Sequence, residues 1–347
     1  MIDLRSDTAT KPTPAMREAI AAAEVGDEQL REDPTVNELE RRAAQTLGHE
    51  DAVFVPTATM ANEIALRVLS APGDELIAEE NAHVLIAELG GPAVFAGLMT
   101  RPLPARAGRF TPEQVRAAAR RGDLGHVPTT RIVSIENTHN SSGGRVWPLP
   151  EVAAIAETCR ELELSLHLDG ARLFNAAVAS GEEPAAIARH ADTVTICFSK
   201  GLGCPLGAIV AGSSERMLRA RRYKHQFGGA MRQAGIVAAG CLYALDNHVQ
   251  RLAEDHARAR RLGEALHEAG VPVDLEQVET NFVQIDVGAL GLQVPQAIER
   301  LLGEGIRVSG TLLPGLLRAV THLGITDEDI DRASEAIPRG LGVPARV

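Results

Sequence analysis

Short apolar segments alternate with longer amphipathic segments along most of the chain. Several of the apolar segments are continuously hydrophobic, and all have strand length: Ala52–Val55, Glu75–Ala78, Arg131–Ile135, Leu164–Leu168, Thr193–Phe198 and Ala208–Ala211. Continuous hydrophobicity is typical of strands in a parallel sheet that helices cover on both faces. The alternation therefore predicts an α/β fold with a doubly wound, mostly parallel sheet.

Capping signals indicate where the intervening helices begin and end. Thr13-Pro14 predicts a helix start, and Gly26 would close that segment. Thr35-x-x-Glu38 matches a capping box ahead of a helix that would stop at Gly48. Thr111-Pro112-Glu113-Gln114 has the same pattern ahead of an Ala/Arg-rich segment.

The pattern changes after about Gly228. Met231–Glu268 has the composition of one long helical stretch without a convincing break. A smaller set of strands and helices follows it: Phe282–Val287, Pro295–Leu302, Leu317–Val320 and Asp327–Ile337. We therefore expect an N-terminal arm and a large domain over residues 1–250 and a small C-terminal α/β domain over 251–347, with Pro338–Val347 poorly ordered.

Composition and charge exclude several classes of function. The chain has 347 residues, of which 45% are hydrophobic and 23% charged, so it can bury a sizeable core. Its net charge of -11 disfavours general nucleic-acid binding, because an acidic surface repels phosphate backbones. The first ten residues lack the apolar run of a signal peptide, and no apolar run reaches the roughly 18 residues of a membrane span. We expect a cytoplasmic protein that binds neither nucleic acid nor membrane.

The cysteines and histidines do not form a metal-binding pattern. Cys159, Cys197, Cys204 and Cys241 are scattered, without a Cys-x-x-Cys pair. A His-x-x-x-His motif is also missing, which disfavours a metal hydrolase. We therefore predict no metal site and no disulfide framework.

A lysine stands where a buried strand is predicted to end. Ser199-Lys200-Gly201 follows Thr193–Phe198 directly. A lysine removed from water more readily becomes a neutral, nucleophilic amine, which is the group that forms a Schiff base. The alternative is a lysine that simply extends to water at the end of its strand.

An acidic residue ends the neighbouring strand-helix unit. Asp169 follows the predicted strand Leu164–Leu168, His167 would share its face of the strand, and Arg172 lies just beyond the turn. A carboxylate here could keep a pyridine nitrogen protonated, and an arginine could bind a substrate carboxylate. Capping of the following helix by Asp169 is the alternative.

Two further polar segments follow predicted strands. Thr57–Asn62 opens a helix, where hydroxyls and free amides would suit an anion such as phosphate, although plain helix capping explains them as well. Glu136–Asn140 follows Arg131–Ile135 and is either part of a site or a surface turn. Ligands of open α/β sheets bind at the carboxyl ends of the strands, where all these segments are expected.

Five motifs together resemble the L-threonine aldolases. These enzymes have the aspartate-aminotransferase fold, called fold type I, belong to the β-eliminating lyase superfamily and use pyridoxal 5'-phosphate (PLP). The resemblance extends over nearly the whole chain, and its motifs are Ile2–Thr8, Ile135–Asn140, His167–Asn175, Ser199–Gly203 and Gly228–Gly235.

The resemblance implies which residues contact the cofactor. Lys200 would carry PLP covalently, Asp169 would pair with its ring nitrogen, and His83 would stack on the ring. Arg172 would lie beside both cofactor and substrate.

It also implies contacts to the phosphate and to the substrate. Ala58 and Thr59 would hold the phosphate, with Arg232 nearby. The substrate carboxylate would be bound by Ser6, Arg172 and Arg318. The β-hydroxyl would lie near His126.

The expected reaction cleaves the Cα–Cβ bond of a β-hydroxy-α-amino acid such as L-threonine or L-allo-threonine, and its products are glycine and an aldehyde. His83, or a water held by His83 and His126, would take the hydroxyl proton. The resemblance further implies a homotetramer built from dimers. The alternatives are another PLP-dependent β-eliminating or carbon–carbon lyase on this fold, and a PLP-binding protein that has lost catalysis.

Four departures from the family pattern bear on these expectations. Ala58 replaces a glycine, which would strain the backbone if that position needs a positive φ. Leu30-Arg31 replaces Tyr-Gly, and His225 replaces a lysine. Val84–Ala87 replaces bulky aromatic residues, from which we expect a wider or more apolar aldehyde side of the pocket.

Overall fold

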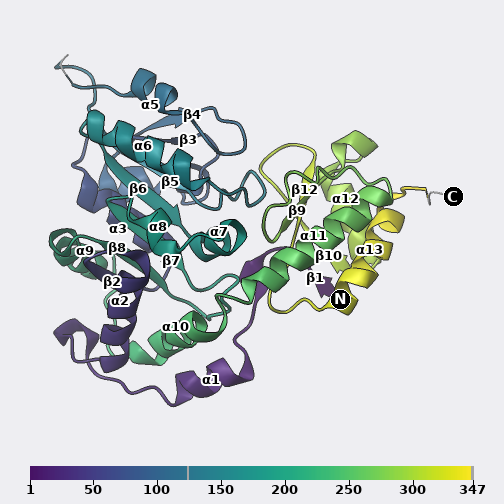
Figure 1. Cartoon of the computed structure of the whole chain (residues 1–347), viewed down its shortest axis with the longest axis horizontal. Coiled ribbons are helices and arrows are strands. Elements are labelled where there is room, and N and C mark those ends of the chain that lie inside the picture. The colour runs from purple at the N-terminus through teal and green to yellow at the C-terminus, as the bar shows by residue number, and fades with distance from the viewer. Residues whose placement is uncertain (123–124, 345–347) are drawn as a thin grey trace.

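A seven-stranded sheet forms the centre of the computed structural model, which describes residues 1–122 and 125–344 (Figure 1). The strand order is β2-β8-β7-β6-β5-β3-β4. Neighbouring strands are parallel, except that β8 is antiparallel to β2 and β7. The strands are β2 (Asp51–Val55), β3 (Glu75–Glu79), β4 (Met99–Leu103), β5 (Thr130–Glu136), β6 (Ser165–Gly170), β7 (Thr193–Cys197) and β8 (Ala208–Gly212).

The sheet confirms the predicted α/β class and all six predicted strands, whose bounds agree within two residues. The edge strand β4 was not predicted. Its sequence, Met-Thr-Arg-Pro-Leu, has no apolar run, and most of it is exposed. An edge strand needs no hydrophobic residues on its open side and accepts a proline such as Pro102, so its pattern is weak.

Helices cover both faces of the sheet, which explains why its inner strands are apolar throughout. Phe54 packs into the core on one face, with residues of α2, α6, α7 and α10. Val53 and Val55 pack on the other face, with α3 and α9. The helices are α1 (Pro14–Ala21), α2 (Pro34–Leu47), α3 (Ala58–Leu69), α4 (His83–Ile86), α5 (Pro112–Ala118), α6 (Leu149–Glu161), α7 (Leu173–Ser180), α8 (Pro184–Ala188), α9 (Ser214–Gln226) and α10 (Gly235–Asn247).

The predicted starts of α1 and α5 are confirmed, but the predicted start of α2 is wrong. Thr13 caps α1, and Thr111 forms a capping box at α5. The cap of α2 is Asp33 and not Thr35, because Pro34 occupies the first helical position and the Asp33 side chain accepts the Val36 N–H at 2.9 Å.

The expected unbroken helix over Met231–Glu268 is also wrong, because the chain leaves the helix between α10 and α11 (Leu252–Glu268). The break begins at His248, whose buried side chain hydrogen-bonds the backbone carbonyl of Leu202 at 2.7 Å. The preceding Asn247 bonds the carbonyl of Tyr243. Both residues are weak helix formers, and the tertiary contact of His248 favours the break.

The C-terminal part of the chain has its own hydrophobic core. An antiparallel sheet of order β11-β12-β9 packs there against three helices, at the right of Figure 1. These elements are β9 (Phe282–Asp286), β11 (Ser309–Gly310), β12 (Leu316–Val320), α11, α12 (Val294–Gly303) and α13 (Asp327–Leu341). None of the helices in the described part of the chain is long and apolar enough to cross a membrane.

Both ends of the chain enter this second core. Strand β1 (Ile2–Asp3) pairs in parallel with β10 (Ile306–Arg307), and Ile2 and Leu4 are buried among C-terminal residues (Figure 1). The first residues of the arm therefore pack with the C-terminal part, although the predicted boundary grouped them with the large domain. The expected disorder from Pro338 is wrong up to Leu341, which is buried at the end of α13; residues 345–347 lie outside the described residues.

The Asp33 cap yields a test of stability. Asp33 is fully buried and accepts backbone N–H groups from Val36, Gly26 and Gly235 at 2.9, 3.2 and 2.8 Å. We predict that Asp33→Ala lowers the free energy of unfolding by about 3 kcal/mol, because it removes a helix cap and leaves buried donors unpaired. Thr35→Ala is the matched control, with an expected loss below about 1 kcal/mol. Equal losses in denaturant titrations of the two variants would contradict this assignment.

Candidate active site

Three strands of the large sheet bring polar side chains together at their C-terminal ends. Glu136 and Asp169 end the parallel strands β5 and β6 and are paired in register. Lys200 follows the end of β7, which pairs in parallel with β6. The carboxyl ends of these strands therefore assemble an acid and an amine on neighbouring strands, where open α/β sheets bind ligands.

Asp169 is buried and held by hydrogen bonds to both carboxylate oxygens. The Asn62 side-chain amide donates to Oδ2 at 2.8 Å, and the Ala171 backbone N–H donates to Oδ1 at 3.1 Å. Burial lowers the pKa of His167 to about 4, so this imidazole is neutral at pH 7. Its Nε2 lies 3.2 Å from Asn62 Oδ1, and its Nδ1 lies 3.0 Å from Thr193 Oγ1. This chain of contacts orients the amide of Asn62 toward Asp169.

Lys200 is half-buried beside the N-terminal arm. Its backbone carbonyl accepts a hydrogen bond from Thr10 Oγ1 at 2.7 Å, and its ammonium contributes to the field around Asp7. The arm thus holds the loop after β7 in place. A half-buried amine at this position can react with a ligand that enters from the open side of the site.

Two arginines from different parts of the chain converge near this lysine. Arg172 pairs with Asp7 through Nε and Nη2, both at 2.7 Å, and is almost fully buried. Burial acts to raise the pKa of Asp7, but the charge and hydrogen bonds of Arg172 and the charge of Lys200 hold it well below its usual range. Only the Nη1 edge of Arg172, 3.4 Å from Asn140 Oδ1, remains for a further anion.

Arg318, on β12, faces the same asparagine. It donates to Asn140 Oδ1 at 3.0 Å and to Ser309 Oγ at 3.0 Å. Within the described ranges, no carboxylate lies within 4.0 Å of this guanidinium, which is half-buried. Burial, followed by the charge of Arg172, lowers the pKa of Arg318. A bound anion would offset both effects, so Arg318 is the better placed of the two arginines to bind a carboxylate.

The arm also places Ser6 near Arg318. Ser6 caps a short 3-10 helix (Asp7–Ala9) and receives the Thr8 backbone N–H at 3.2 Å. The backbone carbonyl of the neighbouring Arg5 accepts a hydrogen bond from Ser309 Oγ, which in turn accepts one from Arg318. Ser6, Arg172 and Arg318 thus lie in one region of the molecule.

His83 begins α4 at the rim of the site. Its backbone N–H donates to Glu136 Oε2 at 2.7 Å, and its Nδ1 lies 2.7 Å from Glu88 Oε1. Burial acts to lower the pKa of His83, but the hydrogen bond to Glu88 and the charges of Asp169 and Glu136 outweigh it and raise the pKa. The imidazole is about one-third exposed, with 32% of its side-chain surface accessible, so it can contact a ligand.

His83, Glu88 and Asp169 offer ligand-type atoms within 4.8 Å of one another. However, the amide group of Asn62 donates to both carboxylates, at 2.9 and 2.8 Å. An N–H donor pointing between two carboxylates opposes a cation at that point. We therefore describe the group as a hydrogen-bonded network.

The start of α3 provides free backbone N–H groups at the same end of the sheet, just after the C-terminal end of β2. Thr57 caps the helix through the Met60 N–H at 3.2 Å, and Thr59 is exposed. Ala58 is the first helical residue and is not among those with a positive φ. Alanine is therefore unstrained where the family pattern has glycine, and the helix start can accept an anion.

Two predicted residues form no hydrogen bond or ion pair with this group among the described residues. Arg232 is exposed and pairs with Asp27 at 3.1 Å. His126 is exposed in the loop that precedes β5, at the amino end of a strand whose carboxyl end carries Glu136. Sequence reasoning did not single out Asn62, Glu88 or Asp7 as site residues, because their roles arise only from the way α3, α4 and the arm pack.

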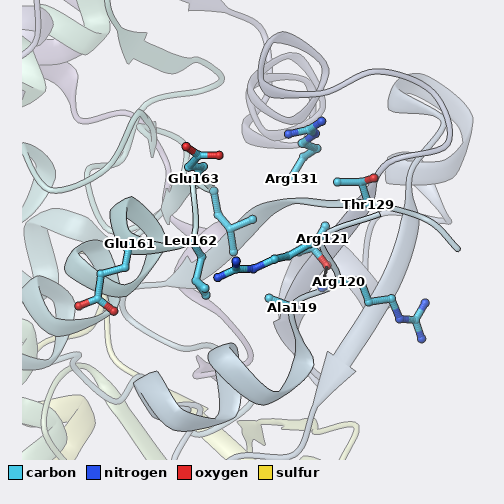
Figure 2. Close-up of a pocket in the computed structure, with 10 residues that line it drawn as sticks. Ala119, Arg120, Arg121, Thr129, Arg131, Glu161, Leu162 and Glu163 are labelled. Atoms are coloured by element: carbon cyan, nitrogen blue, oxygen red, sulfur yellow. Dashed lines mark hydrogen bonds between the residues drawn. The ribbon is translucent and has the colours of Figure 1, made fainter. Parts of the chain in front are cut away.

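A hollow at the opposite end of the sheet, where β5 and β6 begin, is distinct from the candidate active site (Figure 2). Arg120, Arg121 and Arg131 line it together with Glu161 and Glu163. Arg120 pairs with the buried Glu75 at 2.9 Å, so at least part of this basic charge has a structural partner.

The residues of the site fit PLP. A carboxylate fixed by hydrogen bonds suits a protonated ring nitrogen, and a half-buried lysine on the next strand suits covalent attachment. The start of α3 suits a phosphate, and the partly exposed His83 suits one face of a flat ring. The donor set thus matches each chemical part of the cofactor.

Comparisons with known proteins agree with this interpretation. The profile of the family described as "Beta-eliminating lyase" matches residues 3–289. The low specificity L-threonine aldolase of Escherichia coli (strain K12) is 42% identical over 332 residues, which are 95% of this chain and 96% of the relative.

Two solved structures share the fold. A Leishmania major threonine aldolase has a TM-score of 0.84 at 22% identity and covers 98% of this chain and 100% of its own. A Thermus thermophilus aspartate aminotransferase variant has a TM-score of 0.73 at 17% identity, with 98% and 91% covered. At these identities they establish the fold alone, and they confirm the predicted aspartate-aminotransferase fold, fold type I. The family profile and the sequence relatives show that the chain belongs to the β-eliminating lyase family and groups within it with the low-specificity L-threonine aldolases.

Proposed function

We propose that this protein is a PLP-dependent lyase that cleaves L-threonine, L-allo-threonine or related β-hydroxy-α-amino acids to glycine and an aldehyde. The observation that carries the proposal is the placement of Lys200 and Asp169 at neighbouring strand ends, with Arg318 facing the same region from the second core. The matching relatives named low-specificity L-threonine aldolases support the substrate class.

When bound, PLP supplies an electron sink for the electrons of the broken bond. Lys200 would hold the cofactor, Asp169 would keep its ring nitrogen protonated, and His83 would cover one face. Ala58 and Thr59 would hold the phosphate through the start of α3. Because Asp169 is buried and accepts two hydrogen bonds, its side chain is held in one orientation.

Arg318 would bind the substrate carboxylate, assisted by Ser6 and the Nη1 edge of Arg172. Fixing the carboxylate orients the Cα–Cβ bond, and such orientation contributes a large part of the rate acceleration in enzymes. His83 would then accept the proton of the β-hydroxyl. His126 would assist only if another chain brings it to the site, because its own chain places it at the other edge of the sheet.

We also propose that the protein is a cytoplasmic homotetramer. An exposed apolar surface near the site supports self-association, since Ile86, Leu89, Val94 and Phe95 are 38%, 100%, 72% and 44% exposed. The exposed position of Arg232 would allow it to reach the phosphate of a neighbouring chain. All four cysteines are buried and free, which suits a reducing compartment.

Attachment of the cofactor to Lys200 is testable by chemical trapping. We predict that borohydride reduction of the PLP-loaded protein fixes the cofactor to the peptide that contains Lys200, as read by mass spectrometry. Lys200→Ala should lose both the near-visible absorbance band and aldehyde release. Lys11→Ala is the matched control, because Lys11 is exposed and close in space to the backbone of residue 200. Cofactor trapped on another lysine in the wild-type protein would contradict the assignment.

The two arginines should differ when each is replaced by leucine. Arg318→Leu should raise the KM for L-threonine roughly 10–100-fold, as expected for a lost charged hydrogen bond, and change the free energy of unfolding by less than about 1 kcal/mol. Arg172→Leu should lower the free energy of unfolding by about 3–5 kcal/mol, because the buried Asp7 would lose its partner. Steady-state kinetics and denaturant titration separate these outcomes. An Arg318→Leu variant with an unchanged KM would exclude it from carboxylate binding.

The segment after His83 predicts a preference among substrates. Because Val84–Ala87 replaces bulky aromatic residues of the family, we expect kcat/KM for L-phenylserine to equal or exceed that for L-threonine. Ile86 is 38% exposed, and a larger side chain at this position would narrow the aldehyde side. Ile86→Phe should therefore lower kcat/KM for L-phenylserine relative to kcat/KM for L-threonine. A strong preference of the wild-type protein for L-threonine would contradict the expectation.

A further inference from the structure

A buried pair of carboxylic side chains lies behind His83 and has no part in the reaction proposed above. Glu63, on α3, is 1% exposed, and Glu88, just after α4, is 5% exposed. Three of their four carboxyl oxygens have no hydrogen-bond partner among the described residues: both oxygens of Glu63 and Oε2 of Glu88. Buried, unpaired carboxylate oxygens are costly, so the pair requires another explanation.

One shared proton pairs two of these three oxygens and removes the negative charge from the third. A hydrogen bond between the carboxyl groups of Glu63 and Glu88 contributes to the raised pKa of Glu63, and such a bond requires that one of the two groups is protonated. Burial and, after it, the charge of Glu88 raise the pKa of Glu63, which favours the protonated form of Glu63. Gly91 packs directly against this acid, since a Cβ at that position would lie 2.0 Å from Glu63 Oε1.

The remaining oxygen of the pair, Glu88 Oε1, accepts two hydrogen bonds. Its donors are Asn62 Nδ2 at 2.9 Å and His83 Nδ1 at 2.7 Å. The orientation of Asn62 is determined, because the same Nδ2 also donates to Asp169 at 2.8 Å. With the shared proton on Glu63, Glu88 is a carboxylate that can only accept from His83, so the proton of the neutral imidazole lies on Nδ1.

We propose that Glu63 and Glu88 carry one proton between them, and that the anionic Glu88 is a positioning residue that keeps Nδ1 of His83 protonated and leaves Nε2 as the basic atom of the site. This inference rests on the proposed role of His83 in accepting the substrate proton. Glu88 would act through His83 and would not contact the substrate. The arrangement is the general one in which a buried carboxylate selects the tautomer of a catalytic histidine.

Other charges also act on His83 and define the expected pH dependence. Asp169 on β6 and Glu136 at the end of β5 face it, in addition to Glu88. Together these three carboxylates favour the imidazolium and raise the pKa of His83. Neutral His83 should therefore prevail only when the pH is above this raised pKa. Loss of the Glu88 charge should lower that pKa and move the acid limb of the pH–rate profile to lower pH. The maximal rate should fall roughly tenfold or more, because the imidazole becomes a weaker base.

The direct test uses the cofactor-free protein, so that it does not depend on the proposed reaction. Nitrogen NMR of 15N-histidine-labelled protein, with His83→Gln to assign the signal, should show neutral His83 protonated on Nδ1. Infrared spectroscopy at pH 7 should show the carbonyl band of a buried protonated carboxyl that disappears in Glu63→Gln. A neutral His83 protonated on Nε2, or the lack of that infrared band in the wild-type protein, would overturn the proposal even if no variant folds.

Glu63→Gln and Glu88→Gln form a matched pair for the second test. Glutamine at 63 keeps a neutral donor beside Glu88, so the titration of His83 and the pH–rate profile should stay as in the wild type. Glutamine at 88 removes the charge, so both should move to lower pH. Equal profiles for the two variants would contradict the proposal. If the loaded protein releases no aldehyde, the proposed function fails, but the NMR and infrared results still decide this inference.

Discussion

The buried ion pair between Asp7 and Arg172 is the interaction on which the geometry of the candidate active site depends. Arg172 lies three residues after Asp169, at the start of α7, and Asp7 belongs to the arm whose first residues enter the second core. Asn281, next to β9, also donates to Asp7, at 3.3 Å. One contact thus joins the arm, the edge of the large sheet and the second sheet.

This ion pair determines which groups remain for a ligand. Taking two charges out of water is costly, and only good geometry offsets that cost, so the short two-point contact is itself required. Because Asp7 neutralises Arg172, Arg318 keeps an uncompensated charge nearby, and a substrate carboxylate can supply the compensation. The two arginines therefore differ in their partners, although both lie against the ring of Phe282, at 4.9 and 5.8 Å.

Much of the large sheet was predictable because burial on both faces requires continuous apolar strands. The same reasoning placed Asp169 and Lys200 together, since the carboxyl ends of parallel strands meet at one edge. It does not predict β4, whose exposed edge position needs no apolar run. It also predicts Thr35 as the cap of α2, whereas Pro34 at the first helical position makes Asp33 the cap. The break at His248 depends on a contact with Leu202 that lies far away in sequence.

The supporting residues of the site were not predictable in the same way. Asn62 and Glu88 lie on a helix and in a loop, and their partners come from β6 and α4, so no local pattern reports their contacts. The sequence motifs did indicate Arg232 and His126, but both are exposed, and among the described residues neither forms a hydrogen bond with the other site residues.

The central claim is that this site breaks the Cα–Cβ bond of a β-hydroxy amino acid. The most direct measurement is a product balance for the purified, PLP-loaded protein with L-threonine. Our account predicts glycine and acetaldehyde in equal amounts. Formation of an α-keto acid and ammonia would instead indicate elimination, and a cofactor-loaded protein that forms no product from any β-hydroxy amino acid would contradict the proposed function.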